Sequence, residues 1–230
     1  MWYQDMLDNG VSQEIAGVLA DLYTPKIAKL GKPPKIKPIN GRGHFNMWTN
    51  MIEYDPNNGH VIDTLYHEFG HWHDYHTRFK NHRSIMSWGQ IDAIGKEFND
   101  ICNLDWNNLK KTKGKQFASK LKAFDYYVDI QKKYPSWSTG DYFSELAERL
   151  FKKEYNSLDS RERYIVLQYK DTIGSITNGK YGGGHSKEEY RDSWANEEAY
   201  ANAFAAWARK DSVFALDFPE IWKYINDKMK

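Results

Sequence analysis

The chain has 230 residues, enough for one large domain with a substantial core, and its 32 Lys and Arg residues balance 31 Asp and Glu residues. A net charge of +1 provides no broad attraction to nucleic acid or to an anionic membrane, so neither is expected as a partner. The single cysteine, Cys102, excludes an internal disulfide and a zinc site built from cysteines.

No targeting segment is recognisable in the sequence. The first residues lack the basic and apolar regions of a signal peptide, and no run of about 18 apolar residues predicts a membrane span. With one cysteine in addition, we expect a cytoplasmic protein. The 16 Tyr, 11 Phe and 9 Trp residues predict a core rich in large side chains and, less often, a groove for an extended ligand.

The N-terminal part predicts a helix followed by short strands. Apolar residues repeat with helical spacing over residues 11–23, and Pro25 is predicted to end this helix. The proline-rich stretch 33–39 allows only a short edge strand, because proline cannot donate to a ladder. A second extended segment, rich in aromatic and β-branched residues, is expected over residues 44–54.

The rest of the chain predicts mostly helices. One apolar stripe predicts a helix over residues 61–79, and further helical patterns fill residues 83–171. A capping box at 186–189 restarts a helix after a glycine-rich loop, a long helix covers 196–209, and Pro219 opens a C-terminal helix. The predicted fold class is therefore α+β, mainly helical, with a small sheet.

The most informative motif is the HExxH sequence from His67 to His71, inside the predicted helix 61–79. Residues four apart lie one above the other on a helix, so the two imidazoles can bind one metal ion. Both are turned away from the apolar stripe, which predicts that they face a cleft. Glu68 is rotated from them, where a general base can take a proton from a metal-bound water. The motif predicts a zinc site in which Glu68 activates water.

Two histidines and a water leave zinc one protein ligand short. The candidates are nearby or later acids and histidines: His73, Asp74, His76, His82, His185, Glu197 and Glu198. His73 lies on the opposite side of the helix, and Asp74 is about 10 Å of helical rise beyond His67, so Asp74 is expected to orient a ligand imidazole instead. Glu198 lies in a helix that is apolar nearly all round, where a carboxylate needs a partner, and is preferred. Alternatively, Glu198 forms an ion pair or is a partly exposed glutamate at the start of its helix.

Three segments resemble a known family in order along the chain. Residues 67–75 resemble the active-site helix of the anthrax lethal factor catalytic domain and of the related Pro-Pro endopeptidases. Residues 196–204 resemble their later ligand helix, and residues 219–227 resemble their C-terminal segment. Those proteins are zinc peptidases whose third ligand is a glutamate on a later helix. The resemblance therefore implies Glu198 as the third ligand and one Zn2+ ion per chain.

The chain departs from this family in two places. Far more positions separate His71 from Glu198 than in the family, so the helical stretch 81–180 is expected to be an insertion in a single zincin-like metallopeptidase domain, 1–230. The family also has a tyrosine shortly before the glutamate that can hydrogen-bond the oxyanion. The resemblance implies Tyr190 in this role, one position further upstream than expected, with Tyr181 or a purely structural tyrosine as alternatives.

A weaker resemblance links residues 174–185 and the following segment to the C-terminal regions of phage minor head proteins, which suggests a phage origin. The favoured function is a zinc-dependent endopeptidase that acts on an extended protein or peptide, with the strand near 44–54 bordering its cleft. The alternative is a non-catalytic, head-associated or binding protein that retains a zinc site. Hydrolysis of a bond other than a peptide also stays open, and the sequence predicts no oligomeric state.

Overall fold

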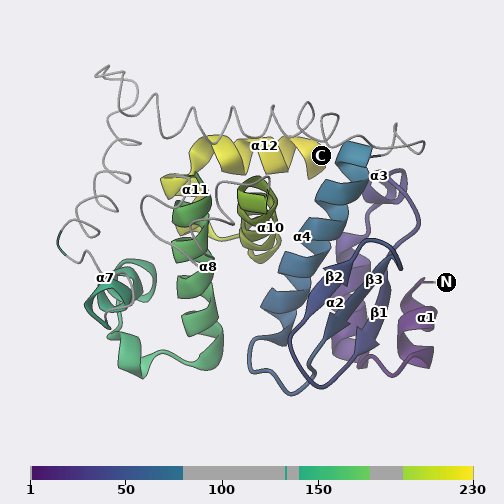
Figure 1. The fold of residues 1–230 in the computed structure, drawn as a ribbon, viewed down its shortest axis with the longest axis horizontal. Helices are drawn as coiled ribbons and strands as arrows, with labels where there is room; N and C mark the ends of the chain where they lie inside the picture. The colour runs from purple at the N-terminus through teal and green to yellow at the C-terminus, as the bar shows by residue number, and fades with distance from the viewer. Residues whose placement is uncertain (1, 80–132, 134–139, 177–193, 230) are drawn as a thin grey trace.

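A computed structural model describes residues 2–79, 133, 140–176 and 194–229 of this chain. The described part is α+β and mainly helical, with one three-stranded sheet, as predicted (Figure 1). The helical patterns predicted between residues 83 and 132 and the capping box at 186–189 lie outside the described residues. Within the described chain, no helix is both long and apolar enough to cross a membrane.

Three short helices precede the sheet: α1 (Trp2–Asp8), α2 (Gln13–Leu22) and α3 (Pro25–Ala28). The Ser12 hydroxyl accepts a hydrogen bond from the backbone N–H of Ile15 and thereby caps α2. Thr24 caps α3 in the same way, with Pro25 at its first position. The helix predicted over residues 11–23 is confirmed. Pro25, expected only to end it, also opens α3, because a first-turn position needs no N–H donor.

The sheet contains β1 (Lys35–Pro38), β2 (His44–Asn46) and β3 (Met51–Tyr54) in the order β1-β3-β2. β1 pairs with β3 in parallel and β2 pairs with β3 antiparallel, so β1 and β2 are the edges of the described sheet. The expectation of a single extended segment over residues 44–54 is wrong. The chain reverses after Asn46, and Asn50 adopts a positive φ of 50°, which asparagine tolerates better than most residues.

The remaining described elements are helical: α4 (Val61–Phe79), α7 (Gly140–Phe151), the 3-10 helix η2 (Tyr155–Ser157), α8 (Ser160–Ile176), α10 (Trp194–Arg209), α11 (Ser212–Asp217) and α12 (Pro219–Met229). α4 has the predicted bounds, and its stripe residues Leu65, Phe69 and Trp72 are buried as expected. Pro219 opens the last helix, also as predicted.

α10 lies in the middle of the helical layer, where it packs against α4, α8 and α12 (Figure 1). Small side chains allow this close packing: Ala199, Ala201, Ala203, Ala205 and Ala206 are all fully buried. On the α4 side, a Cβ atom at Gly70 would lie only 2.8 Å from Ala201 Cα. The glycine inside the HExxH motif therefore lets the backbones of α4 and α10 approach each other.

Residues of α8, including Val166, Tyr169 and Ile173, belong to the same core as α4 and α10. Within the stretch 81–180, α8 thus packs against the two helices that carry the predicted metal ligands. Whether this stretch is an insertion relative to other proteins stays a prediction.

Candidate metal centre

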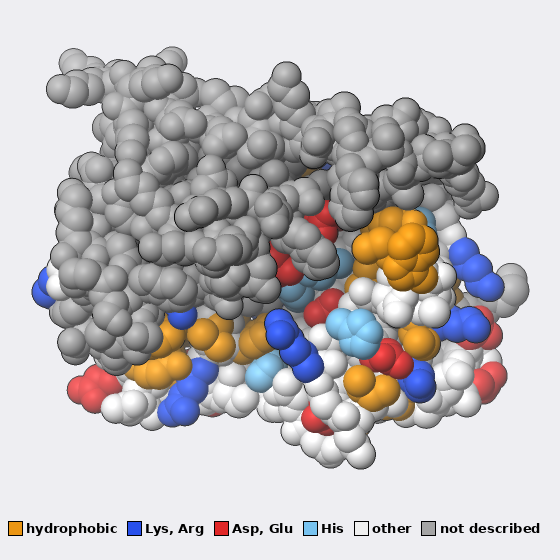
Figure 2. All heavy atoms as spheres, in the orientation of Figure 1, with side chains coloured by type: hydrophobic (Ala, Val, Ile, Leu, Met, Phe, Trp, Pro, Cys, Tyr) orange, Lys and Arg blue, Asp and Glu red, His pale blue; other side chains and the backbone are white. Residues whose placement is uncertain are grey.

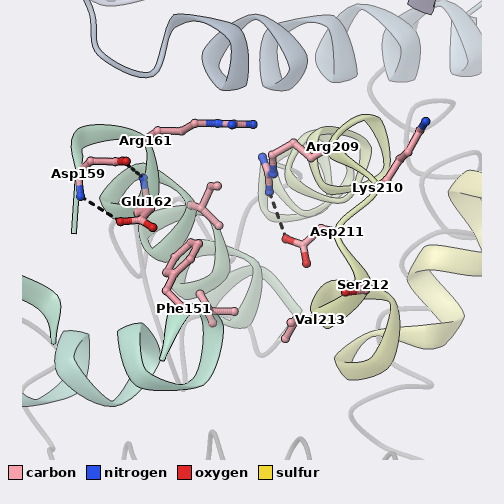
Figure 3. A pocket seen from close by; sticks show the side chains of 11 residues that line it. Phe151, Asp159, Arg161, Glu162, Arg209, Lys210, Asp211, Ser212 and Val213 are labelled. Atoms are coloured by element: carbon pink, nitrogen blue, oxygen red, sulfur yellow. Dashed lines mark hydrogen bonds and ion pairs between the residues drawn. The ribbon is translucent and has the colours of Figure 1, made fainter. Parts of the chain in front are cut away.

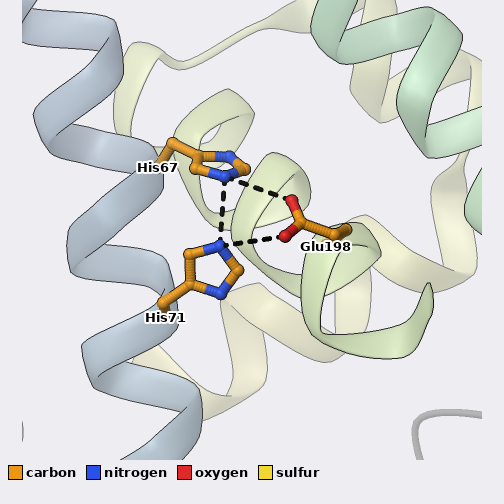
Figure 4. A group of neighbouring side chains, drawn as sticks. All are labelled: His67, His71 and Glu198. Carbon is orange, nitrogen blue, oxygen red and sulfur yellow. Dashed lines mark hydrogen bonds and ion pairs between the residues drawn. The ribbon is translucent and has the colours of Figure 1, made fainter. Parts of the chain in front are cut away.

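Three predicted ligands converge where α4 faces the first turns of α10 (Figure 4). His67 and His71 project from successive turns of α4, and Glu198 projects from α10 between them. His67 Nε2 lies 3.1 Å from His71 Nε2 and 3.3 Å from Glu198 Oε2, and His71 Nε2 lies 3.6 Å from Glu198 Oε1. All three side chains are partly buried.

These three distances fit a shared metal ion. A tetrahedral zinc ion with ligand bonds of about 2.0–2.2 Å separates its ligand atoms by about 3.3–3.6 Å. The distances of 3.1, 3.3 and 3.6 Å lie at or close to that range. The two contacts to Glu198 are longer than the usual 2.7–3.2 Å of an N–H···O hydrogen bond. Two imidazole nitrogens and one carboxylate are also a donor set that zinc accepts.

The electrostatics of His67 favour binding of a cation or a proton. Burial lowers the pKa of His67. The Glu198 carboxylate beside it, with those of Glu68 and Asp171, has a larger effect in the opposite direction, and the resulting pKa is about 9. In the metal-free protein this imidazole is therefore protonated at neutral pH and paired with Glu198. A metal ion must displace that proton, because a histidine ligand binds through a neutral nitrogen.

Glu68 lies outside the cluster of three, as expected of a general base. Its side chain is buried, and its Oε2 accepts a hydrogen bond of 2.7 Å from the backbone N–H of Phe45. Phe45 is in the edge strand β2, so this bond ties the glutamate of the motif to the sheet. The second oxygen, Oε1, accepts no hydrogen bond from the described residues.

The other ligand candidates that the structure describes are not in the cluster. His73 is buried, and its Nδ1 lies 2.8 Å from the Tyr200 hydroxyl, while His76 Nδ1 contacts the Trp72 carbonyl. Asp74 is also buried, but it makes no bond to His67 Nδ1, which has no hydrogen-bond partner among the described residues. Four candidates lie outside the described residues: Tyr181, Tyr190, His82 and His185. The predicted role of Tyr190 is therefore untested.

Two residues of α8 near this centre were not found by sequence reasoning. Asp171 is buried, accepts a hydrogen bond from Asn202 of α10 and contributes to the raised pKa of His67. Tyr164 stacks on the His60 ring at 4.1 Å, and burial together with the nearby carboxylates of Glu68 and other acids raises its pKa. No motif marks either residue.

A separate pocket of about 440 Å³ lies near α8 and the α10–α11 connection (Figure 3). Its charged lining residues include three cations and three acids: Arg161, Arg209, Lys210, Asp159, Glu162 and Asp211. Asp159 and Glu162 bond each other's backbone N–H, and Arg209 pairs with Asp211. The charges thus compensate one another, and none of the cluster residues lines this pocket.

Comparisons with protein-family models, with curated proteins and with solved structures find no match to this chain. The resemblance to the lethal factor family stays a prediction from the three segments that carry it.

Proposed function

We propose that this protein is a zinc-dependent endopeptidase with a zincin-like core, in which His67, His71 and Glu198 hold one zinc ion and Glu68 is the general base. The observation that carries the proposal is the convergence of the HExxH histidines of α4 with the Glu198 carboxylate of α10 at distances that suit a tetrahedral ion. Three protein ligands leave a fourth position for water, which is the pattern of catalytic rather than structural zinc sites.

The positions of the described groups support the following roles. When bound, the ion supplies Lewis-acid chemistry, by polarising the scissile carbonyl and by making a water acidic. Glu68 accepts the proton of that water and passes it to the leaving amine. The Phe45 N–H holds Glu68 Oε2, which keeps the carboxylate oriented while Oε1 exchanges the proton. Tyr190 remains the proposed oxyanion donor on the family resemblance alone.

The sheet supports the proposed substrate class. β2 is an edge strand of the described sheet, and its residue Phe45 touches the proposed general base. An extended peptide can add to such an edge through main-chain groups other than the Phe45 N–H, which Glu68 holds, and this would bring the peptide backbone to the metal centre. An extended peptide or protein segment is therefore the proposed substrate.

The test measures zinc content and cleavage separately. Wild-type protein should contain about one zinc per chain by elemental analysis and cleave peptides in a proteome-derived library. Glu198→Ala should lose most of the zinc, whereas Glu197→Gln, one position away, should keep both zinc and activity. Glu68→Gln should keep zinc and fold but lose about 10²–10⁴-fold in rate, because the amide cannot accept the proton. Zinc-loaded Glu68→Gln that cleaves at the wild-type rate would contradict the proposal.

A further inference from the structure

The turn between β2 and β3 exposes two consecutive large apolar side chains. Trp48 is 89% exposed and Met47 is 44% exposed. The other large exposed hydrophobic residues of the described chain, Leu167 and Leu216, lie singly on α8 and α11. Isolated exposed leucines are ordinary on protein surfaces, but a tryptophan held in water next to a methionine is a frequent anchor of binding surfaces.

This turn is held by side chains at both of its ends. Asn46 Oδ1 accepts hydrogen bonds from the backbone N–H groups of Trp48 at 3.0 Å and Thr49 at 3.1 Å. Asn50 Oδ1 accepts a bond of 3.0 Å from Nε1 of the buried Trp72. The Asn50 amide also donates to the carbonyls of Lys32 and Pro33. A ligand on Met47 and Trp48 therefore meets a surface whose backbone is already ordered, which lowers the entropic cost of binding.

The turn is continuous with the candidate metal centre. Phe45, three residues before Trp48, bonds Glu68 through its N–H, and its ring lies 6.0 Å from that of Tyr75, one helical turn beyond His71. Figure 2 shows a group of hydrophobic side chains beside a hollow with histidine and acidic side chains, on the side where Figure 1 draws β2 and β3. At about 3.3 Å per extended residue, Trp48 is at most about 10 Å along the chain from Phe45.

We propose that Met47 and Trp48 bind a large apolar side chain of the peptide substrate, two or three residues from the scissile bond. The inference rests on the proposed peptidase function and adds a specificity-determining surface to it. The occupant is a Leu, Met or Phe side chain of an extended peptide, because the indole and the thioether present apolar faces.

The experiment compares the zinc-loaded full chain and its Trp48→Ala and Trp48→Phe variants on a proteome-derived peptide library. Wild type should select Leu, Met or Phe two or three residues from the cleaved bond, and Trp48→Ala should lose that selection. On one cleaved peptide, Trp48→Ala should lower kcat/KM by about tenfold, mainly through KM. The same peptide with Ala at the selected position should be cleaved equally by both proteins. Trp48→Phe should keep most of the selection.

The matched control is Leu216→Ala, which removes an exposed apolar side chain that is 75% exposed on α11. It should retain the wild-type selection. Unchanged selection in Trp48→Ala, with zinc and kcat intact, would overturn the surface but leave the peptidase proposal standing. No cleavage by zinc-loaded wild type would overturn both. A dimer that Trp48→Ala alone disrupts, without change in cleavage, would assign the surface to self-association.

Discussion

Two histidines of α4 show how strongly the surroundings of an imidazole control its pKa. His67 faces the carboxylates of Glu198, Glu68 and Asp171, and its pKa is raised to about 9. His73, less than two turns away, is enclosed by the core beside Tyr200 and Phe204. Burial, with smaller contributions from His76, Lys228 and Lys26, lowers its pKa to about 3. Only the first of these surroundings suits a cation.

His73 predicts acid sensitivity of the metal-free protein. Its pKa is about 3 in the folded chain and about 6.5 when unfolded, so the unfolded state binds a proton that the folded state does not. The stability that neutral His73 allows is fully present above pH 6.5 and is lost as pH falls toward 3. Between pH 6.5 and 5 the free energy of unfolding should fall by about 2 kcal/mol through this group. His67 works in the opposite direction by less than about 0.5 kcal/mol, because it is protonated throughout this range in the folded chain and only completes its protonation there in the unfolded chain.

Urea unfolding of chelator-treated protein at several pH values measures this slope. In His73→Gln the decrease between pH 6.5 and 5 should become smaller by about 2 kcal/mol, and the part due to His60, whose pKa burial also lowers, should stay. His44→Gln, which changes an exposed histidine, should keep it. An unchanged slope in His73→Gln would show that another group controls the acid response.

At the level of elements, the candidate centre depends on how closely α4 and α10 pack. The HExxH spacing on α4 was predictable from sequence because helix geometry alone places His67 and His71 together. No spacing rule identifies Glu198. It was predicted from the apolar neighbours on its helix and from the resemblance to the lethal factor family. The β2–β3 turn was not predicted, because the aromatic and β-branched residues of 44–54 are typical of one continuous strand. The chain reverses where Asn46 Oδ1 accepts hydrogen bonds from the backbone of the turn, and composition does not show this.

The close packing of α4 against α10 predicts that position 70 requires glycine, whereas Gly17 on α2 should tolerate a larger side chain. A Cβ at Gly70 would meet Ala201 Cα at 2.8 Å and Phe204 Cβ at 3.0 Å, so Gly70→Ala must push α10 away from α4. We expect a loss of about 1–3 kcal/mol in stability and a loss of roughly tenfold or more in zinc affinity, because Glu198 moves with α10. Chemical unfolding and chelator competition measure the two effects.

Gly17→Ala is the control for that substitution. Gly17 is inside α2, and a Cβ there would meet nothing within 4 Å. Alanine should therefore stabilise the helix by about 0.5–1 kcal/mol and leave zinc affinity unchanged. Equal zinc affinity in Gly70→Ala and Gly17→Ala would refute the claim that close helix packing positions Glu198.

At the scale of the whole molecule, the sequence predicted the longer helices but neither the short helices α1, α3 and α11 nor how the helices pack against one another. Helical periodicity is local, whereas the contacts that assemble α4, α8 and α10 connect residues far apart in the chain. The clearest of these contacts surrounds Asp63, a fully buried carboxylate in the first turn of α4. Its partners come from the start of α8 and the end of α10, and no spacing rule predicts that pairing.

Asp63 predicts a large loss of stability on removal of a single charge. Its Oδ2 accepts a hydrogen bond of 2.7 Å from Arg161 Nε, and its Oδ1 accepts one of 3.3 Å from Arg209 Nη1. The Arg209 side chain is almost fully buried. Asp63→Asn keeps the shape of the side chain but leaves the Arg209 cation buried without this carboxylate, so the free energy of unfolding should fall by about 3–5 kcal/mol.

The exposed Lys223–Asp227 pair on α12 provides the control, and Asp227→Asn should change stability by no more than about 0.5 kcal/mol. Urea unfolding of both variants measures the difference. Equal, small effects would mean that Gln168 and Asp211, which also contact Arg209, are enough to hold the three helices together.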